Sequence, residues 1–463
     1  MKKEETESFS MKNKVGYGFA TFADMVATNF VGFNVLMFYN LVCGVHQDII
    51  TLALIIWSIW NAINDPLLGV LSDRTKTKWG RRKPWIILSV GPMCLILIFM
   101  WMPPLDNSVS TFIYLLVILC LYDTFFTMYS LNQTALFPEM YQDLEERSKA
   151  NTVVQLFGVV ALLFATLVPG FIIRDETFEF RGDYVVSGIV MAVTIVACVL
   201  LFIRLGGIKE RIEFSKDSES APSYLNSMKE SFKSKSFQYF VIANFCVFYV
   251  FTMLPTISPF YAEFVLGVTS PLMKQLMLGG AFIASALFLP VWQKVATKFG
   301  VRKGQMMSMT VFLIALSPFM FVTSMVGGLI IYILLGLGLS GALYFRAVTI
   351  SAVIDEDELN TGVRREGSFY GVNAFITRLT MIAVIISINT VLNYNGWNAA
   401  TLTSATDAQI FGLRALVFIF PAIALTIGIL AMYKFPIHKQ KYEEIKADIG
   451  KLHQKKRELT MKS

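Results

Sequence analysis

Charge is scarce in this chain. Only 16% of the 463 residues are Asp, Glu, Lys or Arg, whereas soluble domains carry roughly 25%. Apolar residues make up 55%, and they gather in repeated runs of about 20 residues, the length that crosses a bilayer as a helix. The deficit of charge therefore excludes an ordinary soluble protein. It predicts an all-α, multi-pass protein of the plasma membrane.

Residues that support catalysis or tight metal binding are also few. The three histidines lie in loops and in the tail, and the five cysteines lie in or beside apolar segments without metal-like spacing. No Gly-Lys-Ser/Thr loop that could cradle a phosphate is present. We therefore expect no enzyme, no cofactor and no direct use of ATP. The net charge of +7 predicts no nucleic-acid partner, because the basic residues lie mostly in alternate loops.

Twelve apolar segments are expected to cross the membrane. The loops after the second and the sixth segments hold six basic residues each, whereas the loops after the first, third, ninth and eleventh hold none. Lys and Arg collect on the cytoplasmic side of membrane proteins, so both termini are predicted to be cytoplasmic. The segments lie near 15–43, 49–72, 84–102, 110–137, 149–173, 184–206, 237–265, 271–297, 304–324, 327–353, 366–394 and 410–434.

A polar stretch divides these segments into two sets of six. An acidic cluster followed by basic residues recurs after the fourth and after the tenth segment, which indicates an internal duplication. The Lys- and Glu-rich tail is expected to be solvated and partly disordered rather than a helix on the membrane face. The predicted parts are a cytoplasmic N-terminus (1–14), a six-helix bundle (15–206), a cytoplasmic loop (207–236), a second bundle (237–434) and a cytoplasmic tail (435–463).

The second segment contains a polar face. Asn61, Asn64 and Asp65 are spaced i, i+3, i+4, so they share one side of a helix. A charge inside a membrane segment is costly and indicates a functional site. Two interpretations stay open from these residues alone. The oxygens converge on a small cation, or a neighbouring helix satisfies the carboxylate.

Other charged and aromatic residues lie in the apolar segments. Asp24 and Arg378 lie deep in the first and the eleventh segment, which indicates a substrate or coupling role, with a permanent ion pair as the alternative. Arg346 is explained by a side chain that reaches the cytoplasmic interface. Trp101 and Trp397 lie near segment ends, where tryptophan anchors a helix at the interface.

Three separated motifs resemble one transporter family. The stretches WNAINDPLLGVLSDRTKTKWGRRKPW, LFPEMYQDLEERS and DEDELNTGVRREGSFYGVNAFITR are similar to the glycoside–pentoside–hexuronide:cation symporters of the major facilitator superfamily. The resemblance covers nearly the whole chain. It implies two six-helix bundles and cation-coupled symport of a sugar or glycoside by alternating access. The implied partners are a small-molecule substrate and membrane lipid, and the implied state is a monomer.

The resemblance also implies a cation site. By motif position, its residues are Asn61, Asn64 and Asp65 of helix 2 and Thr127 of helix 4. The coupling ion would be sodium or a proton, and sodium at Asp65 would be the one metal. The melibiose permease, a member of the family, has a carboxylate where this chain has Asn61. A single carboxylate suits protonation or weaker sodium binding.

The implied substrate site departs from the melibiose permease in one position. The matching residues are Asp24, Ser130, Asn373 and Arg378, and Ser130 replaces a sugar-binding carboxylate. Asp123 lies two helical turns before Ser130 on the same face, but too far along the axis to replace that carboxylate directly. Two alternatives therefore stay open: a symporter of a lysolipid or another amphipathic or anionic solute, and a membrane receptor that does not transport.

Charged residues around the predicted cytoplasmic ends of helices 2, 4 and 10 are expected to form ion pairs that latch one conformation. The alternative is a plain charged loop that only sets orientation. The residues are Asp73, Arg74, Arg81, Arg82, Glu139, Arg147, Arg364 and Arg365.

Overall fold

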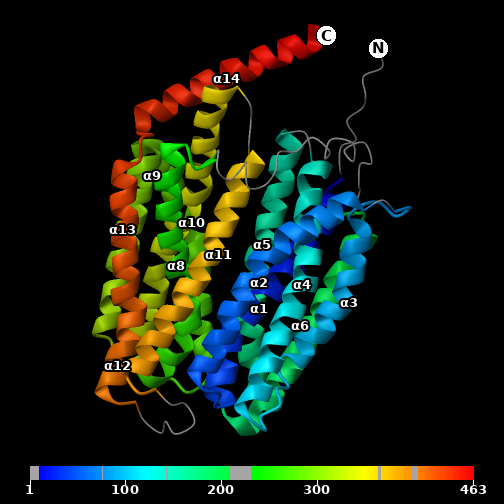
Figure 1. Cartoon of the computed structure of the whole chain (residues 1–463). Helices are drawn as coiled ribbons and strands as arrows, with labels where there is room; N and C mark the ends of the chain where they lie inside the picture. Colours follow the sequence, from blue (N-terminus) through cyan, green and yellow to red (C-terminus); the bar gives the residue numbers. More distant parts are fainter. Residues whose placement is uncertain are drawn as a thin grey trace. The chain divides into compact units, whose positions relative to one another are not determined.

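A computed structural model describes residues 10–75, 77–141, 144–208, 231–362, 366–397 and 405–462. Every regular element in these ranges is helical, so the predicted all-α class is confirmed (Figure 1). Short π-helical segments follow α1 and α12 at Phe38–Val42 and Ala415–Ile419. The α-helices are α1 (Met11–Met37), α2 (Gln47–Arg74), α3 (Lys83–Phe99), α4 (Ser108–Met140), α5 (Leu144–Ile172), α6 (Arg181–Arg204), α8 (Lys235–Phe264), α9 (Pro271–Leu316), α10 (Met325–Thr361), α11 (Glu366–Tyr394), α12 (Asp407–Arg414), α13 (Phe420–Lys434) and α14 (Lys439–Lys462).

Ten helical segments of the described chain are long and apolar enough to cross a membrane. α3 is apolar as well but has 17 residues, and α9 breaks at Gly300, where φ is 77°. A positive φ is accessible to glycine at little cost, so the chain can end one helical part there and begin another. The prediction of a multi-pass membrane protein is confirmed. The count of twelve segments and the cytoplasmic termini stay predictions.

The chain divides into two compact units. The first unit contains α1 to α6 together with Thr269–Gly279, a range that includes the beginning of α9. The second unit contains α8, the rest of α9, and α10 to α14.

In the first unit, small residues let the helices approach closely. Ala20 and Ala23 of α1 are fully buried, and a Cβ atom on Gly18 would lie 2.6 Å from the ring of Phe157 in α5. Side chains of this size permit close contact between membrane helices. α1 therefore packs along α5 and α6, while α4 packs along α2 and α3.

α2 has one lipid-facing side. Its exposed apolar residues recur every three or four positions, which places them on a single stripe. Asn61 and Asp65 fall on the opposite side of the helix, and there α2 packs along α4. The stripe consists of Leu52, Ile56, Ile59, Ile63, Leu67 and Leu71.

The two tryptophans predicted to be interface anchors are buried instead. Trp101 is 1% exposed and packs between the rings of Phe30 and Phe38, with centroid distances of 5.1 and 5.2 Å. Trp397 is 3% exposed and meets the ring of Phe264 edge-on at 4.9 Å. The prediction was wrong because neighbouring aromatic side chains pack against each indole and bury it inside the protein.

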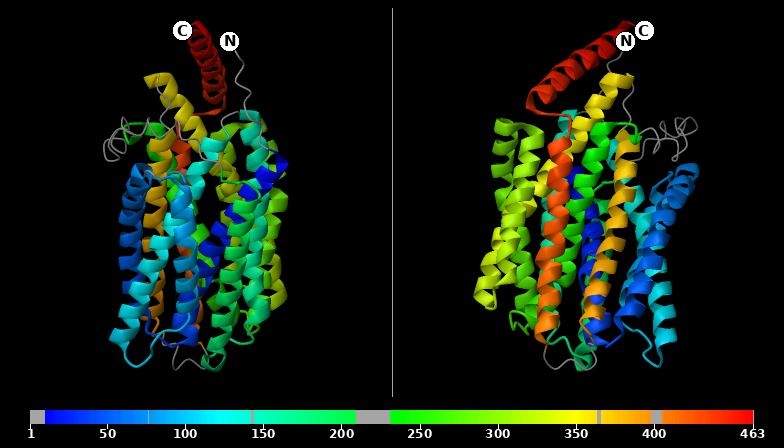
Figure 2. Two further views of the ribbon diagram at one scale, coloured as in Figure 1. Left: turned by 90° about the vertical axis from the view of Figure 1, so that its right-hand side faces the viewer. Right: turned by 60° about the vertical axis from the view of Figure 1, so that its left-hand side comes forward.

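The C-terminal tail forms helix α14 rather than a partly disordered segment. Ile445 and Ile449 lie one turn apart on α14 and are buried, and the helix packs on α10. Lys441 forms an ion pair with Glu356 of α10, which also accepts a hydrogen bond from Ser236 of α8. These apolar and ionic contacts supply the stability that a charged helix lacks alone. α14 passes over the end of α10 in Figure 1, and Figure 2 shows the same helix from two further sides.

Candidate functional site

The predicted polar face of α2 meets α4. Asn61 donates a hydrogen bond from Nδ2 to Oδ1 of Asp123, and Asn64 donates from Nδ2 to Oδ2 of Asp123 at 3.1 Å. One turn further along, Thr127 donates from Oγ1 to Oδ1 of Asp65 at 3.0 Å. These five residues are called the α2–α4 cluster below. It contains two carboxylates, two amides and a hydroxyl.

The two helices keep one register through the cluster. Asn61 and Asp123 are 62 positions apart, and so are Asp65 and Thr127. A constant separation means that α2 and α4 run in the same direction along the seam. Each pair of contacts therefore repeats after one helical turn of both helices. The spacing i, i+4 within α2 matches the spacing i, i+4 within α4.

The cluster lies inside two segments that are apolar enough to span the membrane, Gln47–Gly69 and Ser108–Phe137. Asn64, Asp123 and Thr127 are 2, 3 and 3% exposed, and Asn61 and Asp65 are half-buried. Carboxylates at such a depth are costly and rare unless they serve transport or a buried pair. Carboxylate, amide and hydroxyl oxygens are ligands that hard cations prefer. The arrangement can therefore bind a small cation.

Asp123 was not assigned to this site from the sequence. The sequence predicts one carboxylate at the cation site, whereas the structure places a second one in hydrogen-bond contact with both amides of α2. A signal was available, because Asp123 and Thr127 have the spacing i, i+4 that puts them on one face of α4. Only the register between the helices brings that face to Asn61 and Asn64.

Trp60 lies at the edge of the cluster. Its indole Nε1 donates to Oγ1 of Thr124 at 3.2 Å, which links α2 to α4 beside the Asn61–Asp123 contact. The side chain is also exposed on the apolar side of α2. The ring therefore seals the seam toward the lipid, and its fluorescence can report on changes at the cluster.

Asp24 and Ser130, two residues of the predicted substrate site, lie close together. The side chain of Ser130 in α4 lies close to the carboxyl group of Asp24 in α1. Oδ1 of Asp24 is buried and has no hydrogen-bond partner among the described residues. Most buried polar atoms in native proteins are hydrogen-bonded, and an exception often marks a functional group. The Asp24 carboxyl group is therefore suited to accept hydrogen bonds from a solute.

Three tyrosine hydroxyls fix α1 against α4 around Asp24. Tyr17 of α1 donates to the carbonyl of Gln133 at 2.6 Å. Tyr122 and Tyr129 of α4 donate to the carbonyls of Ala27 and Ala20, both at 2.9 Å. The acceptors Ala20 and Ala27 bracket Asp24 along α1. These bonds position Asp24 opposite Ser130.

The second unit has its own polar group. Asn244 of α8 donates from Nδ2 to Oδ1 of Asn373 in α11 at 2.7 Å, and Oδ1 of Asn244 is buried without a partner in the described part of the chain. Arg378 lies five residues after Asn373 and is half-buried. The guanidinium of Arg346 lies 4.9 Å from the centroid of the Phe248 ring, one turn after Asn244 on α8. Arg346 therefore makes a cation–π contact inside the unit, and its extension to the interface stays a prediction.

Comparison with known proteins identifies the family. A family model described as MFS/sugar transport protein matches residues 16–439. The chain belongs to the MFS/sugar transport protein family. The predicted relation to the glycoside–pentoside–hexuronide:cation symporters is confirmed. A family member of this kind is a secondary transporter, and the prediction that the protein is not an enzyme is confirmed.

Individual relatives are distant but cover the whole family fold. Uncharacterized symporter sll1374 of Synechocystis sp. is 22% identical over 96% of this chain and 97% of its own. Sodium-dependent lysophosphatidylcholine symporter 1-A of Danio rerio is 21% identical over 95% of this chain and 88% of its own. Among solved structures, a variant of the nucleoside transporter NupG has a TM-score of 0.69 at 14% identity and covers 91% of this chain and 100% of its own. The last likeness shows the major facilitator fold alone.

The predicted latch of this family member is only partly described. Arg81 and Arg82 precede α3, where Arg81 is half-buried and Arg82 is 9% exposed. The side chains of Asp73, Arg74, Glu139 and Arg147, and the residues Arg364 and Arg365, lie outside the described residues. The latch stays a prediction.

No group of three or more His, Cys, Asp or Glu side chains within the described ranges could hold a metal ion. The five cysteines are all free thiols. A zinc-type site, which needs four such ligands, therefore has no counterpart in that part of the chain. The two carboxylates of the α2–α4 cluster, supplemented by amides and a hydroxyl, suit a monovalent cation better.

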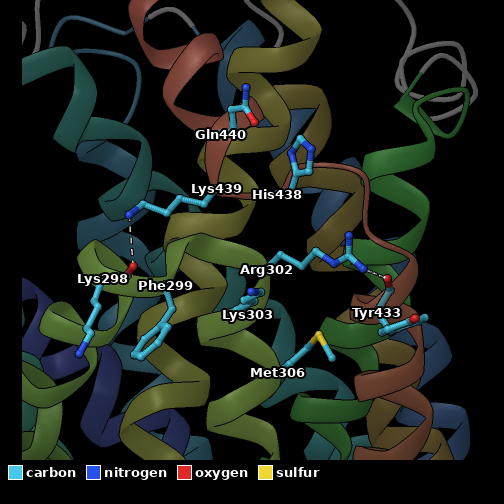
Figure 3. A pocket seen from close by; sticks show the side chains of 9 residues that line it. All are labelled: Lys298, Phe299, Arg302, Lys303, Met306, Tyr433, His438, Lys439 and Gln440. Carbon is cyan, nitrogen blue, oxygen red and sulfur yellow. Dashed lines mark hydrogen bonds between the residues drawn. The ribbon is translucent and has the colours of Figure 1, made fainter.

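A basic pocket of about 500 Å³ lies in the second unit (Figure 3). Arg302 donates to the carbonyl of Tyr433, and Lys439 donates from Nζ to the carbonyl of Lys298 at 3.2 Å. Several of its basic residues lie around 298–303. Basic residues collect on the cytoplasmic side of membrane proteins, so the positive charge of the pocket does not by itself indicate a ligand. The lining residues are Lys298, Phe299, Arg302, Lys303, Met306, Tyr433, His438, Lys439 and Gln440.

Proposed function

We propose that this transporter couples the movement of a cation down its gradient to the symport of a sugar or glycoside by alternating access. The α2–α4 cluster carries the proposal. Its Asn61, Asn64, Asp65 and Thr127 would bind the coupling cation, either sodium or a proton. A cation there would neutralise negative charge that is expensive inside a membrane segment. The cost of the charges is then compensated when the site is loaded.

The substrate would bind at Asp24 and Ser130 of the first unit, and the family resemblance also implies substrate-binding roles for Asn373 and Arg378 of the second unit. The Oδ1 atom of Asp24 supports this role, because it is buried and has no hydrogen-bond donor among the described residues. A sugar hydroxyl would supply the missing donor.

α4 supplies a physical route for coupling. It carries Thr127 toward α2 and, one turn later, Ser130 toward α1. A cation that tightens the α2–α4 seam would also fix Ser130 relative to Asp24. Cation and substrate would then stabilise the same conformation, and each would raise the affinity for the other by the same factor. That reciprocity is the thermodynamic basis of symport.

A lysolipid is the second candidate substrate. Relatives named as sodium-dependent lysophosphatidylcholine symporters match at 21 and 22% identity over nearly all of the chain. Ser130, which stands where the melibiose permease has a sugar-binding carboxylate, is the residue of this chain that favours it. A zwitterionic or anionic head group would pair with Arg378.

Uptake into proteoliposomes tests both candidates. The purified full chain is reconstituted, and a panel of glycosides, pentosides, uronides and lysophosphatidylcholine is offered under an imposed sodium or proton gradient. We expect accumulation above the external concentration for one solute class with one cation, and loss of that accumulation when an ionophore collapses the gradient. Uptake that only equilibrates, whichever gradient is imposed, would overturn cation coupling.

Two variants make the test specific. Asp65→Asn should abolish concentrative uptake while exchange of substrate across the membrane continues, because exchange needs no net cation movement. Asp106→Asn, the same chemical change at an exposed position between α3 and α4, should transport as the unaltered protein does. Full cation-driven accumulation by the Asp65→Asn variant would contradict the assignment of Asp65 to the cation site.

A further inference from the structure

We propose that Asp123 is a ligand of the coupling cation and the second carboxylate of its site, which makes the α2–α4 cluster a site for an alkali cation such as Na⁺. This inference rests on the proposed function, and it adds the residue on α4 that sets the charge of the site. It also favours Na⁺ over a proton, because a proton needs one carboxylate whereas a cluster of five oxygen-bearing side chains matches the coordination of a metal cation.

The contacts fix the carboxylate of Asp123 in place. Asn61 donates to one of its oxygens and Asn64 donates to the other, so two successive turns of α2 hold the group from one side. A carboxylate oxygen has two acceptor directions, and each amide uses one of them. An amide that donates through Nδ2 also keeps its own Oδ1 as an acceptor. The same contacts therefore orient several oxygens without consuming their capacity to bind a cation.

Burial and charge argue against a purely structural Asp123. The residue is 3% exposed and lies in a span of α4 that is otherwise strongly apolar. A neutral side chain such as Asn or Ser could accept hydrogen bonds from Asn61 and Asn64 at a lower cost of desolvation. The charge is also repelled by Asp65, one turn further along the same seam. A bound cation between the two carboxylates offsets both costs.

The contact between Asn61 and Asp123 permits a charge exchange. In the double variant Asn61→Asp/Asp123→Asn, the amide and the carboxylate trade places across an existing hydrogen bond. The net charge of the cluster, its volume and its complement of donors and acceptors all stay the same. In the single variant Asp123→Asn, the shape is kept and one negative charge is lost. The pair separates a need for charge from a need for packing.

Direct cation binding by the purified full chain tests the inference without any substrate. Binding is measured as ²²Na⁺ retained in detergent and as the rise in unfolding temperature with NaCl at constant ionic strength, with choline chloride as the balancing salt. Tryptophan fluorescence gives a third readout, because Trp60 adjoins the cluster. Asp106→Asn serves as the matched control.

We expect Asp123→Asn to weaken Na⁺ binding by roughly tenfold or more, since a unit charge close to the cation is removed. The double variant should recover most of that loss, and Asp106→Asn should bind as the unaltered protein does. If Asp123→Asn does not fold, the double variant decides alone, because it restores the charge. A double variant that folds but does not bind Na⁺ would overturn the inference.

The two failures are distinguishable. If Asp65→Asn abolishes Na⁺ binding while Asp123→Asn binds as the unaltered protein does, Asp123 is a structural acceptor and the inference fails, but the proposed function stands. If the unaltered protein shows no Na⁺ binding by any readout, the alkali-cation site is refuted. If the same protein then showed proton-driven uptake, the proposed cation coupling would stand with a proton as the coupling ion, and only the Na⁺ site would be refuted.

Discussion

Thr127 of α4 donates a 3.0 Å hydrogen bond to Oδ1 of Asp65 in α2, between two segments that are apolar enough to span the membrane. One turn earlier, Asp123 takes the place of the acceptor and Asn61 that of the donor. The seam thus alternates the direction of its hydrogen bonds and keeps one carboxylate on each helix. Charge is shared between α2 and α4, so a cation bound at the seam would hold the two helices together.

The Thr127 hydroxyl should matter more than its methyl group. Thr127→Val keeps the shape but removes the donor to Asp65, and a hydrogen bond to a charged group is worth about 1.5–3 kcal/mol. We expect the cation concentration for half-maximal uptake to rise by roughly tenfold or more, whereas Thr127→Ser, which keeps the hydroxyl, should stay within a few-fold of the unaltered protein. Equal behaviour of the two variants would contradict a role for the hydroxyl.

Asp24 and Ser130 should affect substrate and not cation. Asp24→Asn removes the charge that we assign to solute binding, and Ser130→Ala removes the hydroxyl group beside it. We expect both to raise the KM of the transported solute, Asp24→Asn by more, while the Na⁺-dependent rise in unfolding temperature of the substrate-free protein is unchanged. Loss of the Na⁺ effect in Asp24→Asn would show that the carboxyl group serves the cation instead.

The polar face of α2 could be predicted because it depends only on helix geometry. The spacing of Asn61, Asn64 and Asp65 fixes one side of α2 whatever surrounds it. Asp123 could not be placed in the same way, because its contact with Asn61 depends on the register between α2 and α4. That register is set by close packing along the whole seam, and one sequence does not contain it. The family resemblance predicted Thr127 and left Asp123 aside.

The same limit explains the other differences. Trp101 lies near a segment end, which the sequence shows, but the rings of Phe30 and Phe38 come from another helix and bury it. Arg346 was placed by its depth in α10, and the ring that Phe248 on α8 provides for its guanidinium could not be predicted. The all-α class and the membrane character could be predicted from the composition and the apolar runs. The family could be predicted from the local motifs.

The tyrosine bonds between α1 and α4 should contribute to stability. Tyr129→Phe removes the donor to the carbonyl of Ala20 and leaves a buried acceptor without that bond. The expected cost is about 1–3 kcal/mol, seen as a lower unfolding temperature in detergent. Phe126, on the same helix, provides a control through Phe126→Leu, which changes a ring without removing a hydrogen bond. A Tyr129→Phe protein as stable as the unaltered protein would contradict the role of this bond.

Helix α14 should depend on its contacts with α10. Lys441→Gln breaks the ion pair with Glu356, and both side chains are partly accessible, at 38 and 14%. Because solvent screens such a pair, we expect a loss of no more than about 1 kcal/mol in the stability of the docked helix. Backbone hydrogen exchange in Lys439–Lys451 should then accelerate by up to several-fold, while exchange in α2 and α4 stays the same. Ile445→Ser removes a buried apolar contact and should accelerate exchange more strongly. If neither change altered exchange in α14, the tail would form a helix independently of α10, against the apolar and ionic contacts that hold it here.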